Sequence, residues 1–410
     1  MDYECVILTD DPGALVELCG ISILERLLRT LQRCGITHAT VLSSVPAIAE
    51  QLAQPSWARD QLRLTIRDQP DGIMTAEQII GLVPESARLV LVVRGDSVFD
   101  SRLLRRLTEQ TSAAALVDFG KPCGASLLQR DWMATQNGPL EKMIEDGLKQ
   151  RAITALDVAD EPLYHPALRR KLRPFWFHAP AASQRKQAER ILLDAVQKGS
   201  QDLPAYVHAP IEKFLVSYLC KTSIKPNQVT VIWAIAALVT TVLFATGHLV
   251  AGIVLALIIG MLDGLDGKQA RLKVETTKGG KLEHQVDNFL EAAWPSALAY
   301  HFYASGELPQ AFWYLALLLA AEALDGIGKL GVYVPSEKSK IEPGLLDQIV
   351  RLFGGRRNVY IWVLIVCSIA GVPARALIVM AWWETATAIV DLAHAGWKFY
   401  HRRRKPLPAS

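Results

Sequence analysis

Residues 226–262 read PNQVTVIWAIAALVTTVLFATGHLVAGIVLALIIGML and contain no Asp, Glu, Lys or Arg. A helix needs about 20 mostly apolar residues to cross a bilayer, so this stretch is long enough for two spans. Inside lipid the backbone polar groups must be bonded within the chain, which favours helices over strands. The stretch therefore predicts a helical membrane domain, and it excludes an all-soluble or disordered protein.

Further apolar segments continue to the C-terminus. The six predicted spans are residues 229–247, 249–270, 283–305, 308–330, 358–371 and 374–399. Lys and Arg gather after the second and fourth spans and in the tail, so the positive-inside rule places both termini in the cytoplasm. We therefore predict an all-α, six-helix transmembrane bundle at 229–400 in the cell (inner) membrane, followed by a basic cytosolic tail at 401–410.

Residues 201–228 are predicted to be a linker that contains an amphipathic helix. Ile211, Phe214 and Tyr218 fall at helical spacing within the stretch PIEKFLVSYLCK at 210–221. A helix with one apolar face and one polar face lies in the plane of a membrane surface. We expect this helix on the cytosolic surface, directly before the first span.

Residues 1–200 are charged throughout and alternate short apolar runs with helical segments. Candidate strands are residues 4–9, 39–42, 62–66 and 89–93, and residues 22–34 are a candidate helix. This alternation predicts a cytosolic α/β domain with a mainly parallel sheet. The six cysteines show no CxxC or disulfide-framework spacing, which fits a reducing compartment, and the net charge of +3 gives no support for nucleic-acid binding.

Carboxylates cluster where the second and third predicted spans meet the cytosolic boundary. Asp263 and Asp266 are three residues apart and share a helix face, and Glu283 and Asp287 are four apart at the start of the next helix. Four such charges would repel one another, and carboxylates within a membrane domain are functional candidates. Divalent cations with hard oxygen ligands, Mg²⁺ or Mn²⁺, would resolve the repulsion.

Small residues and an arginine lie beside these acids. Gly264, Gly267 and Ala270 leave the helix surface bare, so a ligand can approach the backbone closely. Arg271 adds a guanidinium fork that suits phosphate. The combination favours a site for a nucleotide diphosphate over charges that merely decorate a helix end.

The sequence DGLDGKQAR, from Asp263 to Arg271, resembles the first half of the signature of the CDP-alcohol phosphotransferases. That signature is D-x-x-D-G-x-x-A-R, followed by a glycine and two more aspartates. The stretch IKPNQVT at 224–230 resembles the segment that enters the first span in that family. The resemblance covers roughly residues 205–400, includes the six-helix count, and implies an integral-membrane transferase. It moves a substituted phosphate from a CDP-alcohol donor to an alcohol acceptor and releases CMP, with one or two Mg²⁺ or Mn²⁺ ions; family members are often homodimers.

The second half of the signature fits the chain in two registers. Counted strictly from Arg271 it falls on Gly280, His284 and Asn288, which would be a broken site. A one-residue deletion in the preceding loop is more easily tolerated than Asn at a metal position, so we prefer the shifted register. The resemblance then implies metal binding by Asp263, Asp266, Glu283 and Asp287, with Asp287 as the catalytic base. It implies binding of the CDP moiety by Asp263, Gly267, Ala270, Arg271 and Gly279.

Basic residues before the fifth predicted span form a second candidate set. Arg351, Arg356 and Arg357 could bind an acidic acceptor, such as a phosphorylated polyol or a lipid head-group. The alternative is a positive-inside flank that touches anionic membrane lipid. The sequence favours neither.

The order of elements before residue 100 resembles the sugar- and polyol-phosphate nucleotidyltransferases. The resemblance rests on the first strand and loop, the segment CGISILER at 19–26, and the Asp96 that follows Gly95; in that family such an Asp binds a metal. The loop TDDPGAL at 9–15 has one glycine, two acids and no cation, and acids there would repel a triphosphate. We therefore predict a degenerate domain. The alternatives are a bifunctional protein whose N-terminal domain also makes a CDP-alcohol, and an inactive membrane scaffold or transporter.

Overall fold

The structure is a computed structural model that describes residues 3–53, 57, 59, 61–68, 74–199, 202–275, 280–332 and 344–403. Within its helices, the side chains at 280–288, 328–332, 398–399 and 401–403 lie outside the description. The chain divides into two compact units. The first comprises Met1–Leu163, Leu172–Ala195 and Leu272–Glu275, and the second comprises Tyr164–Lys171, Val196–Arg271 and Thr276–Ser410.

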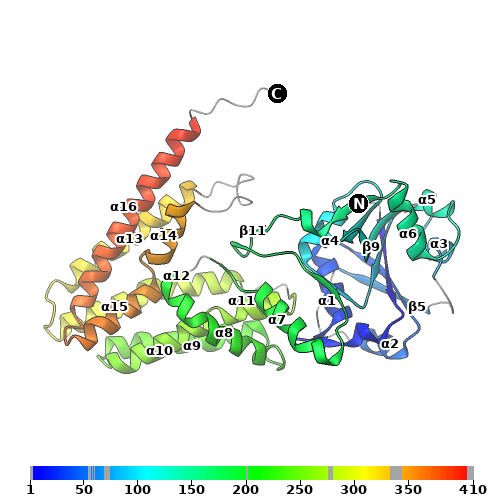
Figure 1. Ribbon diagram of the computed structural model, residues 1–410. Coiled ribbons are helices and arrows are strands. Elements are labelled where there is room, and N and C mark those ends of the chain that lie inside the picture. Colours follow the sequence, from blue (N-terminus) through cyan, green and yellow to red (C-terminus); the bar gives the residue numbers. More distant parts are fainter. Residues whose placement is uncertain are drawn as a thin grey trace. The chain divides into compact units, whose positions relative to one another are not determined.

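The first unit is built on a seven-stranded sheet (Figure 1). Its strands are β1 (Tyr3–Thr9), β4 (His38–Ser43), β5 (Arg63–Asp68), β6 (Leu89–Arg94), β8 (Ala114–Asp118), β9 (Lys121–Gln129) and β10 (Thr154–Asp157), in the order β10-β8-β9-β6-β1-β4-β5. The pairs β1–β4, β1–β6, β4–β5 and β10–β8 are parallel, and only β9 runs antiparallel to its neighbours. The mainly parallel α/β prediction is confirmed.

Smaller elements complete the first unit. The short strands are β2 (Glu17–Leu18), β3 (Ile21–Ser22), β7 (Ser97–Phe99) and β13 (Trp176–His178). The helices are η1 (Pro12–Leu15), α1 (Ile23–Arg33), α2 (Pro46–Ala53), α3 (Ala76–Ile80), α4 (Ser101–Thr108), α5 (Arg130–Ala134), α6 (Leu140–Lys149), η2 (Val158–Asp160), η3 (Ala182–Gln184) and α7 (Arg185–Ala195).

Both faces of the sheet are buried, because successive side chains of the central strands point to opposite sides. Cys5 and Ile7 of β1 belong to one apolar cluster, and Val6 belongs to the other. Helix α1 packs its leucines into the first cluster. It begins where Ser22 Oγ accepts a hydrogen bond from the Glu25 amide, as expected for a serine N-cap.

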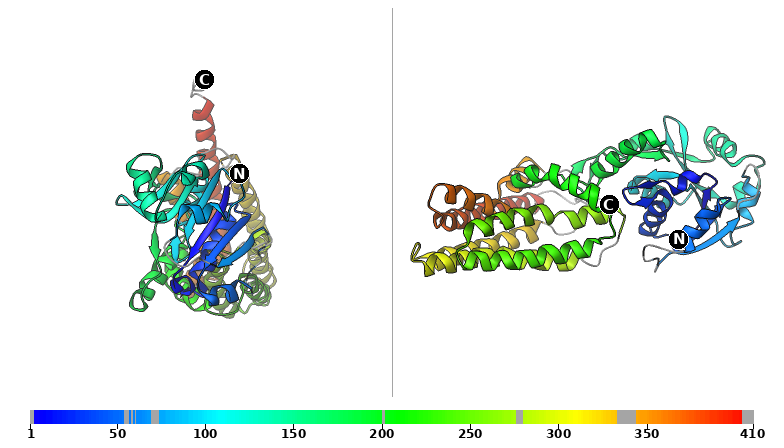
Figure 2. Two further views of the ribbon diagram at one scale, coloured as in Figure 1. Left: turned by 90° about the vertical axis from the view of Figure 1, so that its right-hand side faces the viewer. Right: turned by 90° about the horizontal axis from the view of Figure 1, so that it is seen from below.

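The second unit is helical. It consists of α8 (Leu203–Leu219), α9 (Pro226–Ala245), α10 (Leu249–Leu262), α11 (Leu265–Leu272, of which Leu272 groups with the first unit), α12 (Gly280–Ala304), α13 (Ala311–Val332), α14 (Leu345–Phe353), α15 (Arg357–Ile369) and α16 (Arg375–Arg403), with the short strands β11 (Tyr164–His165) and β12 (Arg170–Lys171). Helices α9, α10, α12 and α13 run alongside one another (Figure 2). A helix lies at each of the six predicted positions.

Fewer of these helices meet the length and apolarity expected of a membrane span. Among the described residues, Pro226–Ala245, Leu249–Leu272 and Arg375–Trp397 do so, and α14 with α15, bent by 50°, would make a fourth. The predicted count of six is therefore not confirmed. Parts of α12 and α13 lie outside the described side chains, so these two helices are described over fewer residues than a span needs.

Helix α8 covers the predicted amphipathic segment and begins earlier, at Leu203. Asp202 caps it by accepting a hydrogen bond from the Ala205 amide. The apolar side chains of Phe214 and Tyr218 are 65% and 72% exposed, whereas the opposite face buries polar groups of the same helix. An exposed apolar row of this kind fits the predicted contact with a membrane surface.

Candidate active site

The two aspartates of the DGLDGKQAR segment lie at the junction between α10 and α11. The sequence predicts one continuous helix here, and the structure interrupts it at Asp263 and Gly264. Asp263 is the C-cap of α10 and keeps helical angles of φ −53° and ψ −37°, and Asp266 lies in the first turn of α11. Glycine is a poor helix former, which explains an interruption at Gly264. The two aspartates therefore belong to different helices, Asp263 to the end of α10 and Asp266 to the start of α11.

Asp266 is buried and tightly held. Its Oδ2 accepts a hydrogen bond from Thr230 Oγ1 of α9 at 2.6 Å, and its Oδ1 accepts one from the Gly267 amide at 2.6 Å. Only 3% of Asp266 is exposed. Each carboxylate oxygen has a second lone pair, so the side chain can still bind a cation while these bonds fix its orientation.

Asp263 pairs with an arginine from a distant helix. Arg357, the first residue of α15, donates from Nη2 to Asp263 Oδ2 at 2.9 Å. The Arg357 guanidinium also lies over the Trp294 ring of α12, 5.4 Å from the ring centroid. The pair offsets the repulsion between the two aspartates, because a cation beside one of them lowers the local negative potential.

The residues expected to contact the CDP moiety surround α11. Arg271 donates from Nε to the Val196 carbonyl at 3.0 Å. A methyl group at Gly267 would lie 3.3 Å from Arg271 Nη1, so the missing side chain leaves room for the guanidinium. Ala270 is buried. The arginine therefore lies against the bare surface of the helix, and its role in phosphate binding stays a prediction.

A buried ion pair between α8 and α11 was not predicted from the sequence. Lys268 Nζ contacts the Glu212 carboxylate, and both side chains are at most 5% exposed. Gln269 donates to the Ile224 carbonyl at 2.6 Å. These contacts anchor α11 two and three residues after Asp266. The available signal was Glu212 itself, a carboxylate inside a largely apolar helix.

His208, one turn before Glu212 on α8, was also missed. It is 3% exposed, and within the described part of the chain neither ring nitrogen has a hydrogen-bond partner. A methyl group at Gly260 of α10 would lie 3.3 Å from His208 Cε1 and 3.4 Å from Asn358 Oδ1. Asn358 Nδ2 in turn donates to Asp202 Oδ2 at 3.2 Å. Polar side chains of α8 thus line the helices that carry Asp263 and Arg357.

The second half of the predicted acidic site lies outside the described side chains. Gly279 is outside the described residues, and Glu283 and Asp287 are placed only by the backbone of α12. Within the described residues, no group of three or more His, Cys, Asp or Glu could hold a metal ion. Asp263 and Asp266 alone offer two of the four expected carboxylates, a donor type that fits a hard divalent cation.

The remaining predicted arginines take separate places. Arg351 lies in α14, and Arg356 is the N-cap of α15, directly before Arg357. Between the two helices, Gly355 donates from its amide to Thr387 Oγ1 of α16 at 3.0 Å. Glu384 of α16 is 1% exposed and accepts a hydrogen bond from Tyr360 Oη at 2.7 Å. The structure thus brings Arg357 onto Asp263, one of the two described acids.

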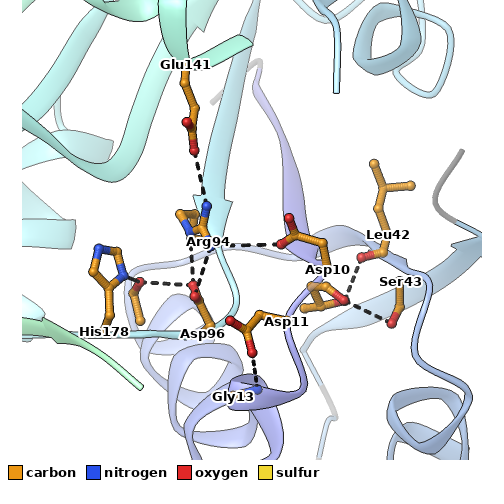
Figure 3. Close-up of polar contacts among 11 residues, drawn as sticks. Asp10, Asp11, Gly13, Leu42, Ser43, Arg94, Asp96, Glu141 and His178 are labelled. Atoms are coloured by element: carbon orange, nitrogen blue, oxygen red, sulfur yellow. Dashed lines mark hydrogen bonds and ion pairs between the residues drawn. The ribbon is translucent and has the colours of Figure 1, made fainter. Parts of the chain in front are cut away.

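In the first unit, polar residues gather where the parallel strands β1, β4 and β6 end (Figure 3). Arg94, the last residue of β6, donates from Nε to Asp96 Oδ1 at 3.1 Å and from Nη2 to Asp96 Oδ2 at 3.0 Å. The same guanidinium reaches Glu141 at 3.2 Å and Asp10 at 4.0 Å. Asp96 is therefore engaged in a bidentate ion pair.

The loop after β1 is closed by its own acid. Asp11 Oδ1 accepts a hydrogen bond from the Gly13 amide at 2.6 Å and caps the short helix η1 (Figure 3).

Burial raises the pKa of Asp96, but the hydrogen bonds and charge of Arg94 outweigh it, so the pKa lies below its usual value. Ser97 bridges Asp96 to His178 Nδ1, with bonds of 3.2 and 2.8 Å.

Comparisons with known proteins bear on both parts of the chain. Residues 223–390 match the model of the family described as CDP-alcohol phosphatidyltransferase. The chain is 26% identical over 407 residues to the bifunctional IPC transferase and DIPP synthase of Aquifex aeolicus, which covers 90% of each chain. A protein of the same name from Thermococcus kodakarensis is 28% identical over 149 residues, or 35% of this chain and 33% of that relative.

Among solved structures, the inositol-1-phosphate CTP transferase from T. maritima resembles 46% of this chain and 95% of its own, with a TM-score of 0.32 and 10% identity. The family match coincides with the helical segment that contains the α10–α11 junction. Residues 223–390 of the chain therefore match a CDP-alcohol phosphatidyltransferase domain, that of a phosphotransferase enzyme.

Proposed function

We propose that this chain transfers a substituted phosphate from a CDP-alcohol to an acceptor alcohol at a membrane and releases CMP. The observation that carries the proposal is the α10–α11 junction. There, Asp263 is paired with Arg357, and Asp266 is fixed by Thr230 and its own helix. Two carboxylates in fixed orientations, next to glycines and an arginine, suit recognition of a metal-bound diphosphate.

Asp263, Asp266 and Glu283, with Asp287, would hold one or two Mg²⁺ or Mn²⁺ ions. Such an ion would neutralise the diphosphate and stabilise the departing CMP. Asp287 takes the proton of the acceptor hydroxyl as that oxygen forms its bond to the donor phosphorus. The bond between the same phosphorus and the bridging oxygen breaks, and that oxygen leaves with CMP.

The side chains around the junction bind and orient the substrates. Arg271, with the bare surface at Gly267 and Ala270, takes the phosphates of the CDP moiety, and Gly279 is a further proposed contact of that moiety. Arg351 and Arg356 are the acceptor-binding candidates, while Arg357 holds Asp263 in place. Uncharged acceptors would make little use of these arginines, so a phosphorylated or lipid acceptor fits them better.

The reaction takes place in the inner membrane. We propose six spans with both termini in the cytoplasm, a helix α8 that lies on the cytosolic surface, and a homodimer. Lysines and arginines concentrated in alternate connectors and in the tail support the orientation.

A chain whose N-terminal region also makes the CDP-alcohol is the second candidate. The two-activity name of the Aquifex relative, which matches both regions, favours it. We propose instead that this region is catalytically silent, because Arg94 already occupies Asp96 and the loop after β1 carries acids. Formation of pyrophosphate from CTP and a polyol phosphate, lost in Asp96→Ala, would support the second candidate and overturn the silent assignment.

The test of the transferase proposal uses the purified full chain with Mn²⁺ and a panel of CDP-alcohols and acceptors, with CMP as the readout. Asp287→Asn should abolish CMP release, since an amide cannot take the hydroxyl proton, while donor binding is largely kept. Its matched controls are His284→Ala and Asn288→Ala, the positions of the strict register. Full activity of Asp287→Asn would remove the proposed base, and metal-independent ligand flux without CMP would favour a transporter.

A further inference from the structure

Three arginines of α1 bind the four-residue segment that directly follows the DGLDGKQAR motif. Arg26, Arg29 and Arg33 are three and four residues apart and share one face of the helix. The segment Leu272–Glu275, like α1, belongs to the first unit. It begins immediately after Arg271 and leads, four residues later, into α12.

The contacts run mainly to backbone carbonyls. Arg26 donates to the carbonyl of Leu272 at the end of α11, and through its other terminal nitrogen to the Leu18 carbonyl at 3.0 Å. Arg29 donates to the Lys273 carbonyl at 2.6 Å and pairs with the Glu275 carboxylate at 3.3 Å. Arginines here satisfy carbonyls that the end of a helix leaves without intrahelical partners, and their charge suits a helix C-terminus.

Burial makes this arrangement specific to the folded first unit. Arg26 is 6% exposed and Arg29 is 3% exposed. Arg29 is also bonded to Glu25 of α1, and Arg33, on the exposed end of the row, donates to the Glu275 carbonyl. Charged groups so far from water need their hydrogen-bond partners, so loss of the segment would leave buried cations unsatisfied.

The segment itself is held in a strained conformation. Val274, between the two bound residues Lys273 and Glu275, has a φ of +53°. A β-branched residue in the left-handed region is strained, and it persists only where its surroundings impose that conformation. Arg29 and Arg33, which are bonded to the neighbours of Val274, Lys273 and Glu275, supply that constraint.

We propose that Arg26, Arg29 and Arg33 are positioning residues for the transferase, and that holding the connector between α11 and α12 is the function of the N-terminal region. The connector joins the helix that carries Asp263 and Asp266 to the helix that carries Glu283 and Asp287. Fixing the first three of its seven residues, Lys273 to Glu275, restricts how the second pair of carboxylates meets the first. The catalytic part of this inference rests on the proposed transfer reaction, whereas the contact itself does not.

The experiment measures the contact and its consequence separately in the full chain. A lysine-specific protease, with mass spectrometry of the 273–274 bond, reports on the contact without any turnover. Removing the two buried donors in Arg26→Met/Arg29→Met should raise cleavage after Lys273 about tenfold or more, because the segment is released. Arg33→Met, at an exposed position that the fold tolerates, should raise it less, and Arg29→Lys should restore part of the protection.

Arg105→Met is the matched control, since Arg105 is an exposed arginine on α4 of the same unit. Mn²⁺ binding, followed by electron paramagnetic resonance, and the Mn²⁺ dependence of CMP release report on the consequence. Both should weaken several-fold in the arginine variants and remain unchanged in Arg105→Met.

The two proposals fail in distinguishable ways. A wild-type chain that makes no CMP sinks the transfer reaction, while the cleavage and Mn²⁺-binding measurements still decide the arginine contact. Equal cleavage of wild type and Arg26→Met/Arg29→Met would overturn the contact. Faster cleavage with unchanged Mn²⁺ binding and CMP release would overturn its role in positioning the acids.

Discussion

At the scale of single residues, three acids of the candidate sites are each held by a specific donor. Asp266 accepts from a threonine, Asp263 from Arg357 and Asp96 from Arg94. The partner decides what the acid can do. An acid held by a neutral donor keeps its charge available for a metal, whereas one held by a bidentate arginine is already compensated.

Asp96→Asn tests the compensated acid through stability. The folded pKa of Asp96 is lower than in an unfolded chain, so the ionised form stabilises the fold above the usual carboxyl pKa. This contribution disappears as the pH falls through the lowered folded value. We expect Asp96→Asn to lower the free energy of unfolding by about 1–3 kcal/mol at neutral pH, and by progressively less in acid. Denaturant titrations across pH measure this.

Glu141→Gln is the control for that measurement. It removes another partner of Arg94, but Glu141 is largely exposed, and exposed ion pairs contribute little. Its unfolding free energy should stay close to that of the wild type at every pH. Parallel pH profiles for Asp96→Asn and the wild type would contradict the role given to the Arg94–Asp96 pair.

Thr230→Val tests Asp266, the acid whose charge remains available for a metal ion. The change keeps the shape of the side chain and removes the hydroxyl that donates to Asp266 Oδ2. With a less well oriented carboxylate, half-maximal CMP release should require several-fold more Mn²⁺, while the helices stay folded. Thr246→Val, at an exposed threonine near the end of α9, is the matched control, and an identical Mn²⁺ requirement in both variants would argue against a metal at Asp266.

At the scale of elements, much of the architecture follows from local patterns. Strands predicted at 4–9 and 89–93 correspond to Tyr3–Thr9 and Leu89–Arg94, because continuous apolar runs identify the buried centre of a parallel sheet. Helix α1 follows from its Ser22 cap and leucine spacing. The antiparallel β9 between β6 and β8 was not predicted, because pairing across a sheet depends on residues far apart in sequence.

The candidate site also contains one part that could be predicted from the sequence and one part that could not. The motif residues near Asp263 and Asp266 share one segment, so their spacing could be interpreted directly. The partners of these acids could not, since Arg357 lies 94 residues from Asp263 and Glu212 lies 56 residues from Lys268. Three-dimensional packing of α8, α11 and α15 assigns those pairs.

Two glycines in different elements give opposite predictions for alanine. A Cβ at Gly355, between α14 and α15, would overlap the Glu384 carboxylate, so Gly355→Ala should destabilise the domain by a few kcal/mol. Gly326 in α13 has nothing within 4 Å of such an atom, and Gly326→Ala should stabilise by up to about 1 kcal/mol through helix propensity. Thermal unfolding in detergent distinguishes the two. A tolerated Gly355→Ala would mean that this loop can move away from Glu384.

At the scale of the whole molecule, the proposed orientation makes a prediction about labelling. In a cysteine-free background, Ser305→Cys lies in the connector between α12 and α13, on the side opposite the basic connectors. A membrane-impermeant maleimide should label it in intact cells. Thr222→Cys, between α8 and α9, should react only after the membrane is opened. The reverse pattern would invert the topology.

Helix α8 ties the chemistry to its surroundings. One side of α8 exposes the aromatic rings of Phe214 and Tyr218, which in the proposed orientation face the acyl chains of the cytosolic leaflet. On the other side, Glu212 forms an ion pair with Lys268, two positions after Asp266. Looser lipid packing or a more curved bilayer changes how deeply such a helix sinks, and Glu212 must move with it. Turnover is then expected to respond to the lipid composition of the leaflet, a coupling that needs no separate sensor.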